Sequence, residues 1–140
     1  MEIRIKKVET QAEKEQIFSI RNEVFVVEQK VDPALEYDEF EDSSTHFIAQ
    51  INNEAVGTAR WRKTPNGIKL ERFAVLKKSR NLGVGSKLVE AVLADLPTEE
   101  YVYLHAQLTA MNLYARHGFQ AIEPQFEEAG IQHYKMILKQ

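Results

Sequence analysis

The chain has 140 residues, of which 44% are hydrophobic, and this length and composition are typical of one domain with its own core, so we expect a single domain over residues 1–140. With 18 basic and 21 acidic residues, giving a formal net charge of −3, the composition indicates neither a disordered chain nor a nucleic-acid-binding surface. The lack of cysteine excludes a disulfide framework, a thiolate zinc site and a cysteine nucleophile. No apolar run approaches the roughly 18 residues of a membrane span, and the N-terminus lacks the apolar core of a signal peptide, so we expect a cytoplasmic protein.

The N-terminal third predicts a strand, a helix and an acidic connection. Apolar and charged residues alternate over residues 3–8, as in a strand with one buried face. Thr10 and Glu13 form a capping-box sequence, which predicts the start of a helix. This helix is expected to bury one face and to end before Pro33. The residues expected on that face are Ile17, Ile20, Val24 and Val27. The acidic segment 32–42 is expected to be a short helix or a loop.

Three strand-like runs follow, at residues 46–51, 55–62 and 68–76. The first two are separated by Asn52-Asn53-Glu54, a connection of hairpin length with turn-forming asparagines. Thr64-Pro65-Asn66-Gly67 makes a second turn before the third run. Together these runs predict an antiparallel meander.

The C-terminal half alternates helices and strands. Apolar residues at intervals of four predict a helix within residues 80–97, and a strand is expected at 101–106. Thr109 is expected to cap the next helix, and Gly118 suits the position just after its end. The last strands are expected at residues 120–123 and 133–138. The order β α (α) β β β α β α β β describes an α/β chain with one mixed, α+β type sheet.

The segment from Arg80 to Ser86 joins a strand to an amphipathic helix and contains two glycines. The first N–H groups of a helix have no intrahelical partner and carry the positive end of its dipole, so they attract anions. Without Cβ atoms in the way, a pyrophosphate fits against the amides of residues 82–86, and Arg80 adds a bidentate cation. An ordinary strand-to-helix turn is the competing interpretation. Leu88 replaces the third glycine of a dinucleotide fingerprint and no Gly-Lys-Ser/Thr occurs, so neither NAD nor ATP is indicated.

The pattern Arg80-X-X-Gly83-X-Gly85 resembles the acyl-CoA pyrophosphate loop of GNAT-type N-acetyltransferases. The strand before it, Leu70 to Val75, also resembles theirs, and Leu113 to Phe119 is similar to the family's Tyr-X-X-X-Gly-Phe segment. More narrowly, Arg21 to Gln29, together with the acidic segment after it and Trp61, resembles the ElaA/YjcF-like branch. The resemblance implies a GNAT-like acyl-CoA N-acyltransferase fold, in which a mostly antiparallel sheet has splayed parallel central strands and is flanked by helices.

The resemblance also implies an activity. It is that of an N-acetyltransferase, which passes an acetyl group from the cosubstrate acetyl-CoA to a primary amine of a small molecule or peptide by direct attack in a ternary complex. The alternatives are an acyl-CoA-binding regulatory module without transferase activity, and an interaction protein with an unrelated glycine loop. We expect no metal, because the four histidines lack metal-ligand spacing, and neither nucleic acid nor membrane as a partner. An unpaired terminal strand at residues 133–138 would permit a homodimer.

In the family, a strand at residues 73–75 pairs through its backbone with the pantetheine arm of the cofactor. Many relatives carry asparagine where this chain has Gln107. The residues that the resemblance assigns to the cofactor are Phe73, Ala74, Val75, Arg80, Asn81, Leu82, Gly83, Val84, Gly85, Ser86 and Gln107. Lys77 and Lys78 either meet the outer phosphates or are solvated surface charges.

Transfer to an ammonium requires a base for its proton and an acid for the departing thiolate. Tyr114 resembles the family's general acid, although its helical position is also that of a core residue. Glu71 and His105, on the two central strands, are the candidate bases, acting either directly or through water, with Glu71 ranked first. The competing interpretation makes Glu71 the ion-pair partner of an arginine such as Arg60 or Arg72.

The acidic segment 32–42 allows two interpretations. Its six carboxylates could line an entrance that attracts a cationic amine through the local field. The alternative is a solvated loop of an acidic protein. The identity of the amine stays open.

Overall fold

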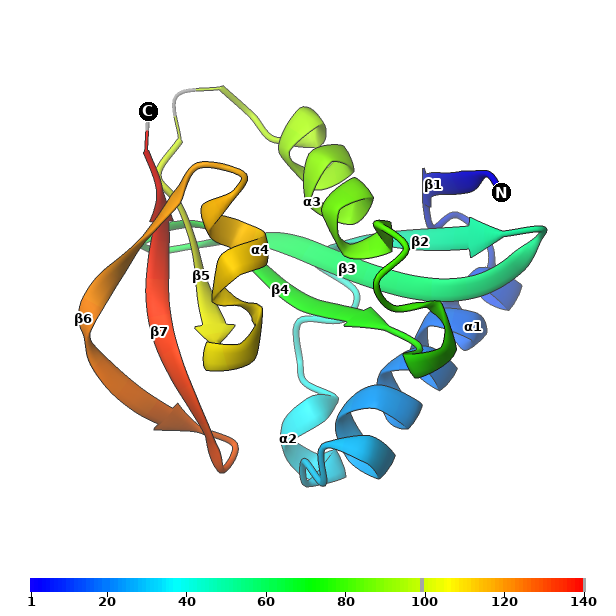
Figure 1. The fold of residues 1–140 in the computed structure, drawn as a ribbon, viewed down its shortest axis with the longest axis horizontal. Coiled ribbons are helices and arrows are strands. Elements are labelled where there is room, and N and C mark those ends of the chain that lie inside the picture. The colour runs from blue at the N-terminus through cyan, green and yellow to red at the C-terminus, as the bar shows by residue number, and fades with distance from the viewer. Residues whose placement is uncertain (99, 140) are drawn as a thin grey trace.

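The computed structural model describes residues 1–98 and 100–139, which form one mixed sheet of seven strands flanked by helices (Figure 1). The strands are β1 Ile3–Lys7, β2 Thr45–Ile51, β3 Glu54–Thr64, β4 Gly67–Val75, β5 Val102–Gln107, β6 Phe119–Glu128 and β7 Ile131–Leu138. The α-helices are α1 Gln11–Arg21, α2 Pro33–Glu36, α3 Val84–Asp95 and α4 Met111–Ala115. The strands lie in the order β1-β2-β3-β4-β5-β7-β6. The order of elements along the chain agrees with the predicted one. No helix in the described part of the chain is long and apolar enough to cross a membrane.

Helix α1 begins with the predicted capping box. Thr10 Oγ1 accepts from the Glu13 amide at 3.1 Å, and the Glu13 carboxylate accepts from the Thr10 amide at 3.1 Å. The helix continues as a π-helical segment, Asn22–Glu28, in which the Gln29 amide donates to the Val24 carbonyl at 3.0 Å.

This π-helical winding changes which side chains face the sheet. Ile17, Ile20 and Val24 are buried as predicted, but Val27 is 49% exposed, so the expectation that it shares their face is wrong. A π-helix has more residues per turn than an α-helix, and this rotates Val27 away from the sheet. Phe25 packs against the buried cluster instead.

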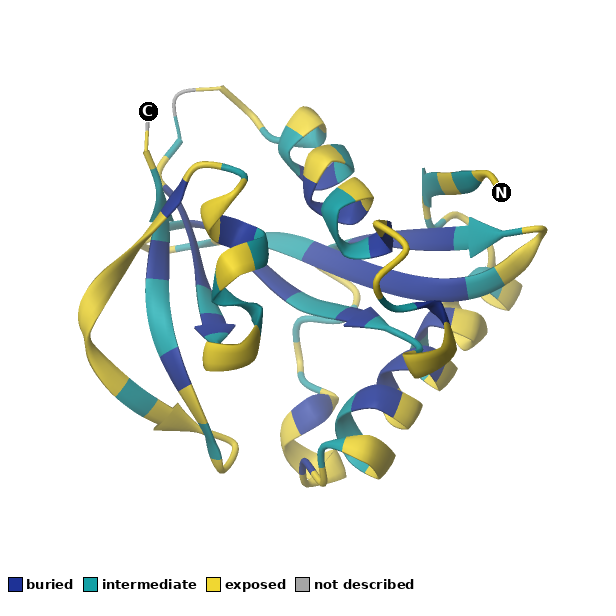
Figure 2. Cartoon of the chain, in the orientation of Figure 1, coloured by how far each residue is buried: buried dark blue, intermediate teal, exposed yellow. Residues whose placement is uncertain are grey.

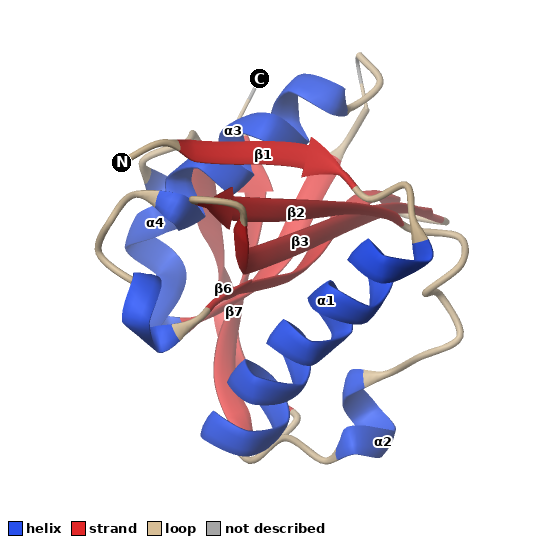
Figure 3. Ribbon diagram, turned by 90° about the vertical axis from the view of Figure 1, so that its right-hand side faces the viewer, coloured by secondary structure: helices blue, strands red, loops and turns tan. Residues whose placement is uncertain are grey.

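Helices α1 and α3 cover opposite faces of the sheet (Figures 1 and 3). Buried residues of α3, Val84, Leu88, Val89 and Val92, pack with the larger core cluster. Ile20 and Val24 pack with Ala74 of β4 in a smaller cluster on the α1 side. Figure 2 shows that burial is concentrated in the central strands and in the helix sides that face them. The central strands are therefore fixed from both faces.

The parallel strands β4 and β5 pair over a short stretch only. Their register pairs Ile68 with Val102 and ends at Leu70 with Leu104, so the remainder of each strand diverges. On its other side, β4 carries a bulge against β3 at Arg72, which has a φ of 60°. The expected splay between the central parallel strands is confirmed.

The C-terminal elements differ from the sequence prediction at three points. Thr109 does not cap a helix, because it lies within a 3₁₀ turn, Leu108–Ala110, that precedes α4. The last two strands are longer than expected. Strand β7 is not an edge strand, because it lies between β5 and β6, so the basis for a dimer through this strand is wrong.

Candidate functional site

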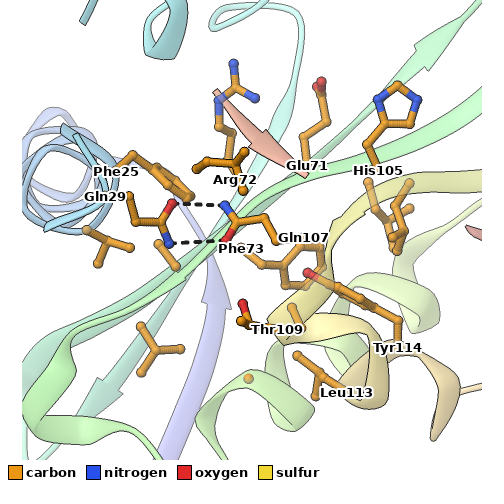
Figure 4. Close-up of a pocket in the computed structure, with 18 of the residues that line it drawn as sticks. Phe25, Gln29, Glu71, Arg72, Phe73, His105, Gln107, Thr109, Leu113 and Tyr114 are labelled. Atoms are coloured by element: carbon orange, nitrogen blue, oxygen red, sulfur yellow. Dashed lines mark hydrogen bonds between the residues drawn. The ribbon is translucent and has the colours of Figure 1, made fainter. Parts of the chain in front are cut away.

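A pocket of about 770 Å³ lies between the diverging ends of β4 and β5 (Figure 4). It extends from the start of α3 to the side chains of Glu71 and His105. Tyr114, Glu71 and His105, the three predicted catalytic residues, all line it. So do the predicted cofactor residues Phe73, Ala74, Val75, Arg80, Asn81, Gly83, Val84, Gly85, Ser86 and Gln107. Leu82 is 44% exposed and is not among the lining residues, and neither are Lys77 and Lys78.

Helix α3 starts at the glycine-rich loop without a cap from the protein. Its N-cap residue is Gly83, which has a φ of 91°, and no side chain within residues 1–98 and 100–139 caps the helix by a hydrogen bond. A Cβ at position 83 would meet no atom within 4 Å, which shows that the loop is open there. Val84, Gly85 and Ser86 of this first turn line the pocket. The uncapped amides and the positive end of the helix dipole together form an environment suited to an anion.

Arg80 lies beside this loop, but its guanidinium already has partners. Its Nε donates to the Val75 carbonyl at 2.9 Å, while Nη1 and Nη2 donate to the Glu28 carboxylate at 2.6 and 2.7 Å. The bond to Glu28 raises the pKa of Arg80, so the guanidinium is charged. An incoming phosphate would therefore share Arg80 with Glu28 or displace it.

Gln107 and Gln29 join the two sides of the pocket (Figure 4). Gln107 Nε2 donates to Gln29 Oε1 at 2.9 Å, and Gln29 Nε2 donates to Gln107 Oε1 at 3.4 Å. Sequence reasoning assigned Gln107 but missed Gln29 and Glu28. Both missed residues lie in the segment that carried the resemblance to the ElaA/YjcF-like branch, but no spacing indicates partners that are far away in the sequence.

Tyr114 is held on α4 by aromatic contacts. Its ring packs edge-on against Phe73, with centroids 5.5 Å apart, and against Phe119 at 6.2 Å. Burial raises the pKa of the Tyr114 phenol above its usual value of 10.0, so the hydroxyl is protonated at neutral pH. Figure 4 shows the hydroxyl pointing into the pocket, and no hydrogen bond to it occurs in the described part of the chain. Tyr114 is thus a packed residue whose protonated hydroxyl faces the pocket.

Glu71 is surrounded by cations. Its Oε1 lies 2.9 Å from Arg60 Nη2 and 2.7 Å from Arg62 Nε, and its Oε2 lies 3.1 Å from Lys69 Nζ. Although burial opposes ionisation, these partners lower the pKa of Glu71 to about 2. The ion pair with Arg60 is present as predicted, whereas Arg72 instead donates to the Glu36 carbonyl at 3.2 Å.

His105 points into the same end of the pocket, beside Glu71 (Figure 4). Its Nδ1 lies 3.1 Å from Oε1 of Glu128, which comes from the end of β6. Glu128 also lines the pocket. Sequence reasoning missed it, because its place beside His105 depends on the pairing of three strands.

Half of the acidic segment is neutralised inside the protein. Glu36 pairs with Arg21 at 2.8 Å, with both side chains 1% exposed. Asp38 pairs with Arg60 at 2.7 Å, and Glu41 lies 2.9 Å from Arg60 and 2.8 Å from Arg21. The exposed members are Asp32, Glu39 and Asp42. Glu36, Asp38 and Glu41 therefore act as counter-ions for buried arginines, a role that neither interpretation of this segment included.

Among the residues that the structure describes, no group of three or more histidine, aspartate or glutamate side chains is placed to hold a metal ion.

Comparison with known proteins agrees with this geometry. The family model of the acetyltransferase (GNAT) domain matches residues 7–140. The chain is 40% identical over 124 residues to the uncharacterized N-acetyltransferase YjcF of Bacillus subtilis (strain 168), covering 86% of this chain and 88% of that protein. The structure is similar to that of Escherichia coli ElaA, with a TM-score of 0.82, 25% identity, and coverage of 99% of this chain and 100% of the other.

The fold is also shared with a GNAT family acetyltransferase from Elizabethkingia anophelis whose structure contains acetyl-CoA. That match has a TM-score of 0.66 and 18% identity, and it covers 96% of this chain and 94% of the other. These similarities extend over nearly the whole chain and include the proteins for which the ElaA/YjcF-like branch is named. Together with the splayed sheet and its uncapped helix, they show that the chain is an acetyltransferase of the GNAT family.

Proposed function

We propose that this protein transfers an acetyl group from acetyl-CoA to a primary amine of a small molecule or peptide, by direct attack of the amine in a ternary complex. The observation that carries the proposal is one continuous pocket, which joins the uncapped start of α3 to the Tyr114 hydroxyl between two diverging strands. Acyl transfer from acyl-CoA requires an anion site for the pyrophosphate, a channel for the pantetheine arm and a proton donor for the departing thiolate.

The cofactor would be bound mainly by backbone groups. The amides of residues 83–86 would receive the pyrophosphate, with Arg80 as a neighbouring cation. The pantetheine arm would lie in the opening between β4 and β5, where the backbone of residues 73–75 has no partner on β5. Gln107 would offer its amide to the same arm. The acceptor would then enter from the end of the pocket that contains Glu71 and His105.

Tyr114 would protonate the departing sulfur. A phenol is an effective proton donor to a thiolate when it is neutral and within reach, and its burial keeps it neutral here. Its contact with Phe73 places the ring next to the strand segment assigned to the pantetheine arm.

The loop assignment is tested by Gly83→Asp, with Gly118→Asp as the matched control. Both glycines have left-handed φ values, 91° and 94°, so both variants carry similar backbone strain. Gly83 lines the pocket, whereas Gly118 does not. We expect acetyl-CoA to raise the melting temperature of the wild type and of Gly118→Asp, because a ligand of the folded state stabilises it. Most of this rise should be lost in Gly83→Asp, whose carboxylate repels the pyrophosphate.

An equal rise in melting temperature in both variants would contradict the loop assignment.

Transfer itself is measured as release of the CoA thiol in the presence of a panel of amines. Binding of acetyl-CoA without thiol release for any amine would identify an acyl-CoA-binding module instead.

A further inference from the structure

The acceptor end of the pocket contains two groups that can take a proton from an ammonium, Glu71 and His105. Glu71 is engaged on both oxygens by Arg60, Arg62 and Lys69. Its pKa of about 2 means that a proton on this carboxylate is lost readily, and protonation would also disrupt three ion pairs. Glu71 is therefore a fixed counter-ion and a poor base at neutral pH.

His105 has the opposite arrangement, because only one of its ring nitrogens is engaged. Nδ1 lies 3.1 Å from Glu128 Oε1, and no hydrogen bond to Nε2 occurs within residues 1–98 and 100–139. The bond to His105 lowers the pKa of Glu128, so this carboxylate is charged and can only accept. Nδ1 must then carry the hydrogen, and in the neutral ring the lone pair is on Nε2.

The position of Glu128 is fixed by the tight hairpin between β6 and β7. Glu128 pairs with Ile131 across the turn, and between them Ala129 and Gly130 have φ values of 53° and 77°. Two successive left-handed residues are typical of a type I′ turn, which joins antiparallel strands without distortion. Because β7 pairs with β5, this turn brings Glu128 next to His105.

The ring of Phe126 contacts two histidines, His105 and His133. It packs edge-on against His105, with centroids 5.0 Å apart, and stacks on His133 at 5.7 Å. His133 donates from Nδ1 to the Ile131 carbonyl at 2.7 Å, and its Nε2 lies 3.9 Å from Glu128 Oε2. The His133 side chain is 7% exposed, whereas that of His105 is 25% exposed. Of the two imidazoles beside Glu128, His105 is thus the one more open to a molecule in the pocket.

We propose that Glu128 is a positioning residue for His105, whose Nε2 takes the proton of the acceptor ammonium. The inference rests on the proposed function and adds to it a base and the group that orients that base. The proton passes from the ammonium to Nε2 and then to solvent. The freed lone pair forms the amide bond as the thioester C–S bond breaks. A second proton leaves the nitrogen and ends on the CoA sulfur through the Tyr114 hydroxyl, which donates one proton and regains one.

Glu128 has two effects in this scheme. Its hydrogen bond holds Nδ1, so that Nε2 faces the pocket, and its charge stabilises the imidazolium that forms. The charged and titratable groups around His105 are Glu128 from β6, His133 and Lys135 from β7, Tyr103 from β5, and Lys69 and Glu71 from β4. Among these described groups, Glu128 is the one that is hydrogen-bonded to the His105 ring.

The first test uses histidine ¹⁵N NMR on the protein without ligand, comparing Glu128→Gln with Glu127→Gln. Glu127 is exposed and lies outside the pocket, so its variant removes the same charge without touching His105. His105→Gln assigns the signals. We expect the Nδ1–H tautomer in the wild type and in Glu127→Gln, and a weaker preference for it in Glu128→Gln only, because a glutamine amide can donate as well as accept. An Nε2–H tautomer in the wild type, or the same tautomer preference in both variants, would overturn the proposal.

The second test is the pH dependence of kcat/KM for the amine at saturating acetyl-CoA. Loss of the carboxylate disfavours the imidazolium, so the acidic limb should move to lower pH in Glu128→Gln, with a plateau lowered about 10-fold. His105→Ala should lower kcat/KM by about 100-fold or more. The double variant His105→Ala/Glu128→Gln should have the same kcat/KM as His105→Ala alone, because Glu128 acts through His105. A further loss there would show that Glu128 acts independently of His105.

The two tests separate this proposal from the proposed function. If the wild type acetylates no amine, the function and the catalytic role of His105 both fail, while the NMR result still decides whether Glu128 orients the ring. If transfer occurs but the acidic limb is unchanged in Glu128→Gln, the proposed function stands and the role of Glu128 fails.

Discussion

At the scale of single residues, Tyr114 combines a packed ring with a hydroxyl that faces the pocket. Its ring is part of the core cluster with Phe73 and Phe119, and its hydroxyl end opens to the pocket. The sequence pattern left core packing and acid catalysis as alternatives. The structure shows that they do not exclude one another, because the two roles use opposite ends of the side chain.

We expect Tyr114→Phe to lower kcat while leaving the affinity for acetyl-CoA nearly unchanged. The substitution retains the ring contacts and removes only the proton donor, so the loss falls within the roughly 10²–10⁴-fold range of general acid catalysis. Steady-state kinetics and calorimetric titration with acetyl-CoA measure the two quantities. Tyr101→Phe, at a residue that is 44% exposed and outside the pocket, is the control. A kcat equal to that of the control would remove Tyr114 from catalysis.

At the scale of elements, the end of the π-helical segment contacts two residues assigned to the cofactor. Glu28 holds the guanidinium of Arg80, and Gln29 exchanges hydrogen bonds with Gln107. These contacts come from adjacent residues, so a single shift of this segment would release both. The π-helical winding that turns Val27 outward is also what positions its neighbours over the pocket.

Glu28→Gln tests the effect of this segment on cofactor binding. If Arg80 receives the pyrophosphate as proposed, the Glu28 carboxylate competes with it, and we expect acetyl-CoA to bind up to about fivefold more tightly in the variant, as for an exposed ion pair. Glu54→Gln is the control, because Glu54 forms a comparable exposed pair with Lys78 at 2.6 Å, away from the pocket. Calorimetric titration at several salt concentrations gives the affinities. Weaker binding in Glu28→Gln would indicate that Glu28 orients Arg80 for the phosphate.

At the scale of the whole molecule, a network of charges joins segments that are distant in sequence. Arg21 of α1 and Arg60 of β3 have side chains 1% and 0% exposed. Their carboxylate partners come from α2, from the loop after it and from β4. Removing one partner from such a network would leave a buried charge unpaired, which is strongly destabilising. This network holds α1 and the acidic segment against the sheet next to the pocket.

The free energy of unfolding should decrease steeply in acid. Although burial opposes ionisation, cationic partners lower the pKa of both Asp38 and Glu71 to about 2, from the ordinary values of 3.8 and 4.5. Their contribution is therefore complete above about pH 5 and is lost as the pH falls toward 2, and Glu71 supplies on the order of 2–3 kcal/mol of it. Urea unfolding between pH 7 and pH 2 measures this slope. Glu71→Gln should be less stable at pH 7 and less sensitive to acid, whereas Glu54→Gln should keep the slope of the wild type.

Much of the fold follows from short-range features of the sequence. The capping box at Thr10 fixes the start of α1, and Asn52 and Asn53 adopt the left-handed conformations that close the β2–β3 hairpin. The glycine-rich entrance to α3 is likewise a local property, because the backbone of Gly83 needs a positive φ. Such signals depend on residues a few positions apart, so they can be recognised in the sequence without the tertiary structure.

The partners across the pocket were decided only by the tertiary structure. The network of Arg21 and Arg60, the bond of Gln29 to Gln107 and the bond of Glu128 to His105 join residues from strands and helices far apart in the chain. Periodicity shows which face of an element is apolar, but it does not show which polar side chains meet when the sheet pairs. By itself the sequence determined the order of elements, the glycine-rich helix start and the candidate acid. Strand pairing determined the charge state of Glu71 and the orientation of His105, because electrostatic environments depend on neighbours in space.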